Sequence, residues 1–290
     1  MVRATSNAAE NLLFSDRIKR RYERFWIHRE LSFHTRGLCQ LSYLTREDPP
    51  EKWHCCNYWQ RKLSNKWNSR EFVCRLGCAV PELYWSGRRV EDIPFDRLPD
   101  RYVIRPVVGH SKKGVFVIDH GLNLIDRKNY TEEQIRSVLR PIVAGFPPRR
   151  ILVEELLRPE RGVPSDRPME YKIHAFGDVI GAIVANQYGP ELLSSGFDER
   201  WNLLPDLYQS QKRFRPSVEP APPECLSELV RWAKVLGTAY ESYVRVDFYA
   251  TERGCVFGEF AATPFRGAGF TVFGDQHLGE CWDRTFPDAV

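Results

Sequence analysis

Polar and apolar residues alternate strictly along one segment in the middle of the chain. Polar residues at 170, 172 and 174 alternate with apolar residues at 171, 173 and 175, which predicts a β-strand with one polar and one apolar face. Similar strand-like runs cover 102–108, 115–119, 150–155 and 179–186. The pair Gly177-Asp178 precedes the last of these runs and predicts a tight hairpin turn.

Two further strand-like runs lie near the end of the chain. YVRVDFY (243–249) and CVFGEF (255–260) flank the segment 251–254, and this arrangement predicts a second hairpin. Far upstream, the segment VPELYWSG (80–87) predicts a short strand that leads into a turn.

Apolar residues recur at helical intervals in four segments, which predicts four helices. These segments are 8–32, about 57–79, 131–139 and 227–240. Thr131 and Gln134 have the spacing of a capping box, and Pro141 predicts that this helix ends near Leu139. Residues 187–224 contain several prolines and little periodicity, which predicts a long, mobile or substrate-facing connection without regular structure. Strands and helices mixed in this order predict an α+β or α/β fold.

Composition narrows the class of protein. With 290 residues, of which 42% are hydrophobic and 28% charged, the chain can form one large or two modest domains. No segment approaches the roughly 20 apolar residues of a membrane-spanning helix, and the N-terminal residues do not have the pattern of a secretory signal. We therefore expect no membrane span and a cytoplasmic location. The net charge of +4 gives little support for a nucleic-acid partner.

The cysteines are expected to be reduced thiols. Eight are scattered along the chain without a secretory signal, which does not favour a disulfide framework. A zinc site at His54, Cys55 and Cys56 with Cys74 and Cys78 is disfavoured, because no Cys-x-x-Cys pair is present.

The second hairpin carries charged residues at positions where they meet. A two-residue period places Arg245 and Asp247 on one face, and Glu259 on one face with Cys255 and Phe257. Pairing about the turn brings Asp247 and Glu259 nearly opposite each other. Because paired carboxylates repel, a divalent ion such as Mg²⁺ between them is one interpretation. Neutralisation of both acids by Arg245 is the other, and the hairpin alone leaves both open.

A second candidate site is the glycine- and lysine-rich loop between two predicted strands. Its members are Gly109, His110, Ser111, Lys112, Lys113 and Gly114. Such a loop presents backbone N–H groups and ammonium charges to a polyphosphate, although similar loops are commonly just solvated turns. On the strand 170–176, Lys172 can reach a phosphate, whereas His174 is interpreted as a solvent-facing or hydrogen-bonded histidine without a catalytic role.

In their order and spacing, these pieces resemble the ATP-grasp enzymes, and within them the TupA-like group associated with bacterial cell-surface polysaccharides. The resemblance extends over about residues 60–275. It is carried by NKWNSREFV (65–73), the segment 80–118, ILVEELL (151–157), MEYKIHAFGD (169–178) and the segment 244–265. It implies an ATP-grasp fold with two α+β subdomains that clasp ATP after an N-terminal α/β region. The corresponding division is 1–100, 101–186 and 187–290.

The resemblance also implies roles for individual residues. The nucleotide would be bound by the loop 109–114, by the hinge residues Glu154, Glu155 and Leu156, by Glu160 at the ribose, and by Lys66, Arg105 and Lys172 at the phosphates. Asp247 and Glu259 would bind Mg²⁺. Arg245, Lys172 and Arg105 would be catalytic, because they cancel charge on the transferred phosphoryl group.

Three positions depart from the family pattern. Arg105 replaces a lysine, Asn65 replaces an aspartate, and Ala261 stands where many ATP-grasp enzymes have a metal-binding asparagine.

The resemblance implies an ATP-dependent carboxylate–amine ligase that acts through an acyl phosphate. Its substrates would be a small-molecule or saccharide carboxylate and an amine. Replacing Asp247 with Asn or Glu259 with Gln is expected to abolish turnover and leave the fold intact. A nucleotide-binding accessory protein and a kinase that phosphorylates a hydroxyl are the alternatives. Neither the oligomeric state nor the identity of the two substrates follows from the sequence.

Overall fold

The computed structural model of the chain describes residues 18, 21, 42–56, 59–109, 113–144, 149–163, 165–188, 191–214 and 219–287, apart from the side chain of Arg266. Most of the helix expected over 8–32 lies outside these residues, as do His110, Ser111 and Lys112 of the glycine- and lysine-rich loop. The chain forms two compact units, Arg36–Arg158 and Met1–Thr35 with Pro159–Val290.

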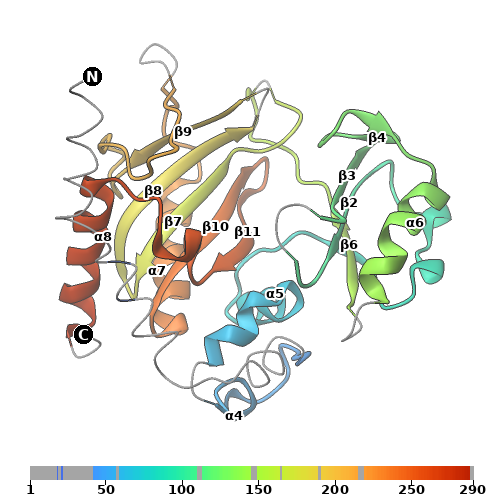
Figure 1. The fold of residues 1–290 in the computed structure, drawn as a ribbon, viewed down its shortest axis with the longest axis horizontal. Helices are drawn as coiled ribbons and strands as arrows, with labels where there is room; N and C mark the ends of the chain where they lie inside the picture. Colours follow the sequence, from blue (N-terminus) through green and yellow to red (C-terminus); the bar gives the residue numbers. More distant parts are fainter. Residues whose placement is uncertain are drawn as a thin grey trace, which may run out of the picture. The chain divides into compact units, whose positions relative to one another are not determined.

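The Arg36–Arg158 unit is built on a six-stranded antiparallel sheet with the order β1-β6-β2-β3-β4-β5 (Figure 1). Its strands are β1 (Leu83–Gly87), β2 (Arg101–Pro106), β3 (Phe116–Asp119), β4 (Leu122–Asn123), β5 (Lys128–Asn129) and β6 (Ile151–Glu155). Its helices are α4 (Pro50–Trp53), α5 (Lys66–Arg75), α6 (Glu132–Val143) and the short 3₁₀ helices η2 (Trp59–Ser64), η3 (Val90–Asp92) and η4 (Phe95–Arg97). The core forms where buried residues of α6, such as Ile135 and Leu139, pack on buried strand residues such as Ile104.

The other unit contains a five-stranded antiparallel sheet with the order β11-β10-β7-β8-β9 (Figure 1). Its strands are β7 (Glu170–Phe176), β8 (Val179–Tyr188), β9 (Leu192–Phe197), β10 (Tyr243–Thr251) and β11 (Gly254–Ala261). Its helices are α7 (Leu226–Tyr240), α8 (Val272–Thr285) and the 3₁₀ helix η6 (Pro264–Gly267). The expected α+β class, both hairpins and the helix near 227–240 are therefore confirmed.

The helix α7 covers the apolar face of the five-stranded sheet. Its Gly237 approaches β7 so closely that an added Cβ would lie 2.9 Å from the Cβ of Ala175 and 2.3 Å from the carbonyl oxygen of Gly177. Ala175 belongs to the apolar positions of β7. The alternating polar residues of β7 consequently lie on the face opposite α7.

The helix α6 begins as the sequence predicts and ends later. Thr131 and Gln134 form the capping box, with the Thr131 N–H donating to Gln134 Oε1 at 2.8 Å. The helix continues through Pro141 to Val143, so the predicted end near Leu139 is wrong. Pro141 lies in the last turn, where it removes one backbone hydrogen bond, and the next residue, Ile142, is buried in the core.

Two other expected elements differ from the structure. The single helix expected over 57–79 is two elements, η2 and α5, separated at Asn65, whose extended backbone and side chain cap α5 by accepting from the Trp67 N–H. Within 187–224, expected to lack regular structure, β9 forms and pairs with β8 from Ile183↔Phe197 to Tyr188↔Leu192. Its LLSSGF sequence shows no two-residue period, so the neighbouring strand determines its conformation.

The compact units divide the chain elsewhere than the expected boundaries at 100/101 and 186/187. The first expected boundary passes between β1 and β2, which belong to one sheet, and the second falls within β8. The chain instead passes from one unit to the other between Arg158 and Pro159, because β7 pairs with β10 on one side and with β8 on the other.

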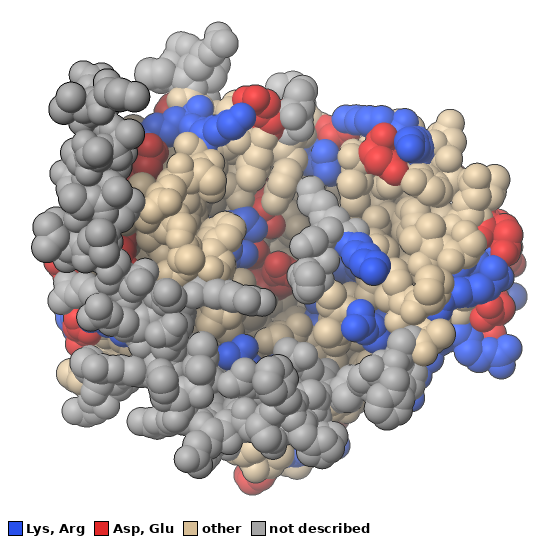
Figure 2. Space-filling model, viewed as in Figure 1, with Lys and Arg blue, Asp and Glu red and all other residues tan. Residues whose placement is uncertain are grey.

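The distribution of surface charge and the character of the helices agree with the expectations from composition. On the face shown in Figure 2, basic and acidic side chains are interspersed among uncharged ones. None of the described helices is long and apolar enough to cross a membrane.

The approach of α7 to β7 generates a prediction about stability. Replacing Gly237 with Ala should lower the free energy of unfolding by about 1–3 kcal/mol, because the new methyl group meets backbone atoms that cannot move aside. This loss should outweigh the gain of roughly 1 kcal/mol that Ala brings to a helix. Urea unfolding followed by circular dichroism measures the change. Thr238→Ala, at the exposed neighbouring position, is the control, and a stabilised Gly237→Ala variant would contradict the packing.

Candidate functional site

Strand register gathers charged residues on the polar face of the five-stranded sheet. Asp247 on β10 pairs with Lys172 on β7 and with Glu259 on β11. Arg245 pairs with His174 on β7. Since residues directly opposite each other point to the same side of a sheet, these side chains share one face. The expected pairing of Asp247 with Glu259 is confirmed.

Asp247 is fully buried and lies between two cations. Arg245 donates to both of its oxygens, from Nε to Oδ1 at 2.7 Å and from Nη2 to Oδ2 at 2.7 Å. The Lys172 ammonium donates to Oδ2 at 2.8 Å and lies 2.9 Å from Oε2 of Glu170. Two cations and two carboxylates thus form one compact cluster, which we call the Asp247 cluster.

Mutual pairing keeps the members of the Asp247 cluster charged. Burial raises the pKa of Asp247, but Arg245 and Lys172 outweigh burial and leave this pKa below its usual value. Burial lowers the pKa of Lys172, but Asp247 and Glu170 outweigh it and leave that pKa raised. The pKa of Arg245 is also raised, because Asp247 more than offsets burial. A buried charge is tolerated only with such partners.

A bulge places Glu259 on the face of Asp247. The register shifts between Asp247, which pairs with Glu259, and Phe248, which pairs with Phe257, so Gly258 is an extra residue. Glu259 therefore points away from the face of Phe257, and the expectation that it shares a face with Cys255 and Phe257 is wrong. A Cβ at Gly258 would lie 2.9 Å from the Tyr249 ring and 3.0 Å from the Asp247 carbonyl oxygen.

The carboxylates of Asp247 and Glu259 fit Mg²⁺ as a partial ligand set. No group of three or more His, Cys, Asp or Glu side chains placed to hold a metal occurs among the described residues. Mg²⁺ typically takes one or two carboxylates and completes its shell with phosphate oxygens and water. Asp247 accepts three N–H bonds, and a carboxylate has roughly four acceptor positions. The half-exposed Glu259 would then be the more accessible ligand.

His174 lies fully buried beside the Asp247 cluster. Its Nδ1 is 2.8 Å from the hydroxyl of Tyr243, and its Nε2 bonds the hydroxyl of Tyr208. Burial, followed by the charge of Arg245, lowers the pKa of His174 to about 3. The ring is therefore neutral, and the interpretation of a hydrogen-bonded histidine is confirmed.

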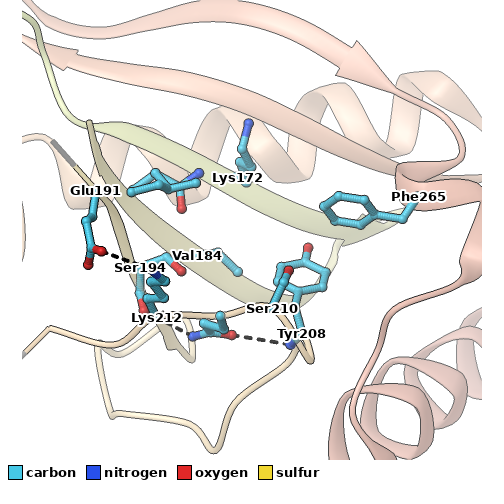
Figure 3. Close-up of a pocket in the computed structure, with 11 residues that line it drawn as sticks. Lys172, Val184, Glu191, Ser194, Tyr208, Ser210, Lys212 and Phe265 are labelled. Atoms are coloured by element: carbon cyan, nitrogen blue, oxygen red, sulfur yellow. Dashed lines mark hydrogen bonds and ion pairs between the residues drawn. The ribbon is translucent and has the colours of Figure 1, made fainter. Parts of the chain in front are cut away.

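A pocket of about 350 Å³ opens on the polar face next to the Asp247 cluster (Figure 3). Lys172 and Val184 line it from the sheet, Tyr208 from the segment after β9, and Phe265 from η6. All of its lining residues belong to the Pro159–Val290 unit. Sequence reasoning did not find this pocket.

Arg105 and Glu154 form a second buried charged group, in the Arg36–Arg158 unit. Glu154 is 2% exposed and accepts from Arg105 Nε at 2.6 Å and from Arg70 Nη1 at 3.2 Å. Two arginines thus share one carboxylate. No role for Arg70 follows from the sequence, because Arg70 and Glu154 lie 84 positions apart and no local pattern links them.

The other hinge and ribose candidates lie in defined contacts. The Glu155 N–H donates to the Glu82 carbonyl oxygen at 2.9 Å, and its carboxylate accepts from the Glu82 N–H at 3.0 Å. Leu156 is buried. Glu160 belongs to the other compact unit, where its carboxylate accepts from the Cys225 N–H at 3.4 Å and burial raises its pKa.

The structure describes four of the candidate phosphate-binding residues of the Arg36–Arg158 unit besides Arg105: Lys66, Gly109, Lys113 and Gly114. Lys66 is the first residue of α5, and its N–H donates to the Val107 carbonyl oxygen at 2.9 Å, which ties the helix to the end of β2. Lys113 is exposed. Gly114 has a φ of +70°, and its Cβ would lie 2.4 Å from Cδ1 of Ile142, so glycine is required there. Gly109 is described and has open space around it.

Sequence reasoning thus identified several members of each charged group and missed others. The structure brings Lys172, Arg245 and Asp247 together in one unit, and Arg105 and Glu154 together in the other. Glu170 was missed as a cluster member, although the two-residue period already placed it on the face of Lys172. For Phe265, the sequence carries no such signal.

Comparisons with known proteins give a family and a fold. The model of a protein family described as TupA-like ATPgrasp matches residues 55–283, which include both sheets and all three residues Lys172, Arg245 and Asp247. No curated protein sequence matches the chain.

Solved ligases have a similar fold. A D-alanine–D-alanine ligase from Bacillus anthracis matches with a TM-score of 0.51 and 15% identity, over 78% of this chain and 68% of that chain. The VanG D-Ala:D-Ser ligase from Enterococcus faecalis matches with a TM-score of 0.50 and 16% identity, over 81% and 64%. The chain thus spans about two thirds of the length of these ligases, and such identities show a common fold alone.

The buried, neutral His174 generates a prediction about pH. An unfolded histidine binds its proton near pH 6.5, whereas His174 in the fold does so at about 3. Between these values the unfolded state binds more protons, so stability should fall as the pH falls. Lowering the pH from 7.5 to 5 should cost about 2 kcal/mol through this one residue. Urea unfolding of wild type and of His174→Gln measures it; equal pH slopes would contradict it.

The buried Asp247 generates a prediction about the two metal candidates. Asp247→Asn should destabilise the fold by about 3–5 kcal/mol, because Arg245 and Lys172 lose the charge that compensates them in a buried place. Glu259→Gln, at a half-exposed position, should change stability by less than about 1 kcal/mol. Chemical denaturation of both variants gives the comparison. Equal stability of Asp247→Asn and wild type would show that the cluster does not depend on the carboxylate charge.

Proposed function

The chain belongs to the TupA-like ATP-grasp family, and from this premise we propose that it binds ATP with Mg²⁺ and joins a carboxylate to an amine. The observation that carries the proposal is the buried Asp247 cluster with Glu259 opposite Asp247 on the neighbouring strand. A site with paired carboxylates and fixed cations suits a metal-bound polyphosphate.

The proposed reaction has two steps. An oxygen of the substrate carboxylate attacks the γ-phosphorus of ATP, the bond to the bridging oxygen of ADP breaks, and an acyl phosphate forms. The amine nitrogen then attacks the acyl carbon, inorganic phosphate leaves, and the nitrogen loses a proton to give an amide. No covalent bond to the protein is needed, so positioning and charge compensation supply the catalysis.

The residues of the sheet would supply that charge compensation. Lys172 and Arg245 carry the positive charge next to Asp247, and we assign them to the transferred phosphoryl group together with Arg105. Asp247 and Glu259 would hold Mg²⁺, which, when bound, offsets the negative charge of the phosphates. Burial strengthens each of these interactions, because the local dielectric is lower than that of water.

We assign nucleotide binding to residues of the Arg36–Arg158 unit and to Glu160. Lys66, Arg105 and the loop Gly109–Gly114 would contact phosphates, the backbone of Glu154, Glu155 and Leu156 the adenine, and Glu160 the ribose.

The substrates belong to the proposal as well. Small-molecule or saccharide carboxylates and amines are the expected classes, in polysaccharide modification or the synthesis of its precursors. We place the reaction in the cytoplasm, where ATP and Mg²⁺ are supplied.

Two alternative functions differ in their products. A nucleotide-binding accessory protein is favoured by Ala261, which pairs with Arg245 where many ATP-grasp enzymes have a metal-binding asparagine; it would release no ADP with any substrate pair. A kinase would release ADP and leave a stable phosphate ester on a hydroxyl, with no amide.

Glu259 provides the test of the nucleotide and metal site. Calorimetric titration with a non-hydrolysable ATP analogue should show tighter binding with Mg²⁺ than without it. Glu259→Gln should remove most of that Mg²⁺ dependence and lower ADP formation by about 100-fold or more, a loss typical of removing one group that stabilises transition-state charge. Binding and turnover are measured on the same preparations.

Glu252→Gln is the matched control, because Glu252 is an exposed acid on the turn of the same hairpin. It should behave as wild type. Absence of nucleotide binding in wild type, with or without Mg²⁺, would remove the proposal, and full turnover in Glu259→Gln would remove the metal assignment.

A further inference from the structure

The pocket beside the Asp247 cluster is open to a ligand of limited size. Its volume of about 350 Å³ is typical of small-molecule sites. The sheet contributes one wall, and the segment 208–212 with η6 contributes the others (Figure 3). The side chains of its walls therefore indicate which kind of ligand it can bind.

Lys172 is the member of the Asp247 cluster that lines the pocket. An ammonium has three N–H donors. Two carboxylates, Asp247 and Glu170, lie next to the Lys172 ammonium, which leaves one donor for another acceptor. The side chain is 16% exposed and lines the pocket. A ligand that enters the pocket can therefore present an acceptor to Lys172, and a carboxylate gives the strongest such bond.

The aromatic side of the pocket is formed by Phe265 and Tyr208. Phe265 is 59% exposed although it is a large apolar side chain. It also has a φ of +51°, a left-handed backbone conformation that is strained for a residue other than glycine. Its ring lies 5.3 Å from that of Tyr208 in an edge-to-face arrangement. Exposure and strain at one aromatic residue are typical of a ligand contact.

Among the described residues, the remaining walls carry neutral or mutually paired side chains and are held in place. Gln211 accepts from the N–H groups of Leu207 and Tyr208 at 3.0 and 3.3 Å, and donates to the Ser194 carbonyl oxygen at 3.3 Å. These bonds hold the 207–211 segment against β9, so this wall is formed before a ligand binds. At the rim, Glu191 and Lys212 form an ion pair of 3.0 Å and cancel each other.

We propose that this pocket holds the carboxylate substrate, and that this substrate is a monocarboxylate whose neutral body has a flat face one ring wide. The carboxylate lies at Lys172, and the flat face lies on Phe265. The assignment as a substrate pocket rests on the proposed function, since it takes the Asp247 cluster as the phosphoryl-transfer end. The charges of the cluster cancel, as do those of the rim, and such walls disfavour a polyanionic body.

Three small probes separate the parts of this claim. Benzoate has both the carboxylate and a flat ring, benzamide is its neutral analogue, and acetate has the carboxylate alone. Titration by ligand-observed NMR, without nucleotide, should give saturable binding of benzoate, with benzamide and acetate each at least about tenfold weaker, which corresponds to about 1.4 kcal/mol.

Variants then locate the benzoate. Phe265→Ala should weaken benzoate at least about tenfold and leave thermal stability unchanged, because most of the ring is exposed. Phe273→Ala is the matched control, since Phe273 is an aromatic residue of α8 that stacks on His277 and does not line the pocket. Equal binding of benzoate and benzamide, acetate as tight as benzoate, or unchanged benzoate binding in Phe265→Ala would each overturn the proposal.

A separate titration with the ATP analogue and Mg²⁺ distinguishes this proposal from the proposed function. Nucleotide binding without the expected benzoate selectivity overturns the pocket assignment and leaves the ligase proposal standing. The expected benzoate selectivity without nucleotide binding supports a carboxylate site and overturns its role in a ligase.

Discussion

The buried carboxylate of Asp247 is the constraint on which the rest of the polar face depends. A fully buried charge must be compensated, and its two partners come from different positions: Arg245 from its own strand and Lys172 from β7. The bond from Lys172 forms only in the observed register of β7 and β10, whereas the bonds from Arg245 lie within β10. The same register sets His174 beside Arg245, and the bulge at Gly258 brings Glu259 to the same side. The register that pairs the strands is therefore also the register that assembles the candidate site.

Because of this coupling, the two candidate metal ligands, Asp247 and Glu259, differ in how much they contribute to the stability of the fold. Asp247 holds two buried cations in place, so its charge contributes to the fold as well as to any chemistry. That changes the expectation from sequence that its replacement by Asn leaves the fold intact. Glu259 is half-exposed and lies where the strand is already bent by the bulge. Its carboxylate is therefore the part of the site whose function is separable from stability.

Local patterns predicted most strands and part of the site. Pairing of 243–249 with 255–260 about the turn at 251–254 sufficed to place Asp247 opposite Glu259, and the Thr131–Gln134 spacing gave the start of α6. Contacts between distant segments could not be predicted in this way. Arg70 reaches Glu154 across 84 positions, β9 takes its conformation from β8, and the strain at Phe265 has no sequence pattern.

The two compact units differ in the charge that they offer. In the Arg36–Arg158 unit, the side chains assigned to the phosphates are cationic: Arg105, which donates to Glu154 together with Arg70, and Lys66 and Lys113. In the other unit, the charges of the Asp247 cluster cancel, and Glu259 adds a negative one. The first set attracts phosphates and the second attracts a divalent cation. Each unit, considered by itself, thus suits one component of the ATP and Mg²⁺ that we propose as ligands.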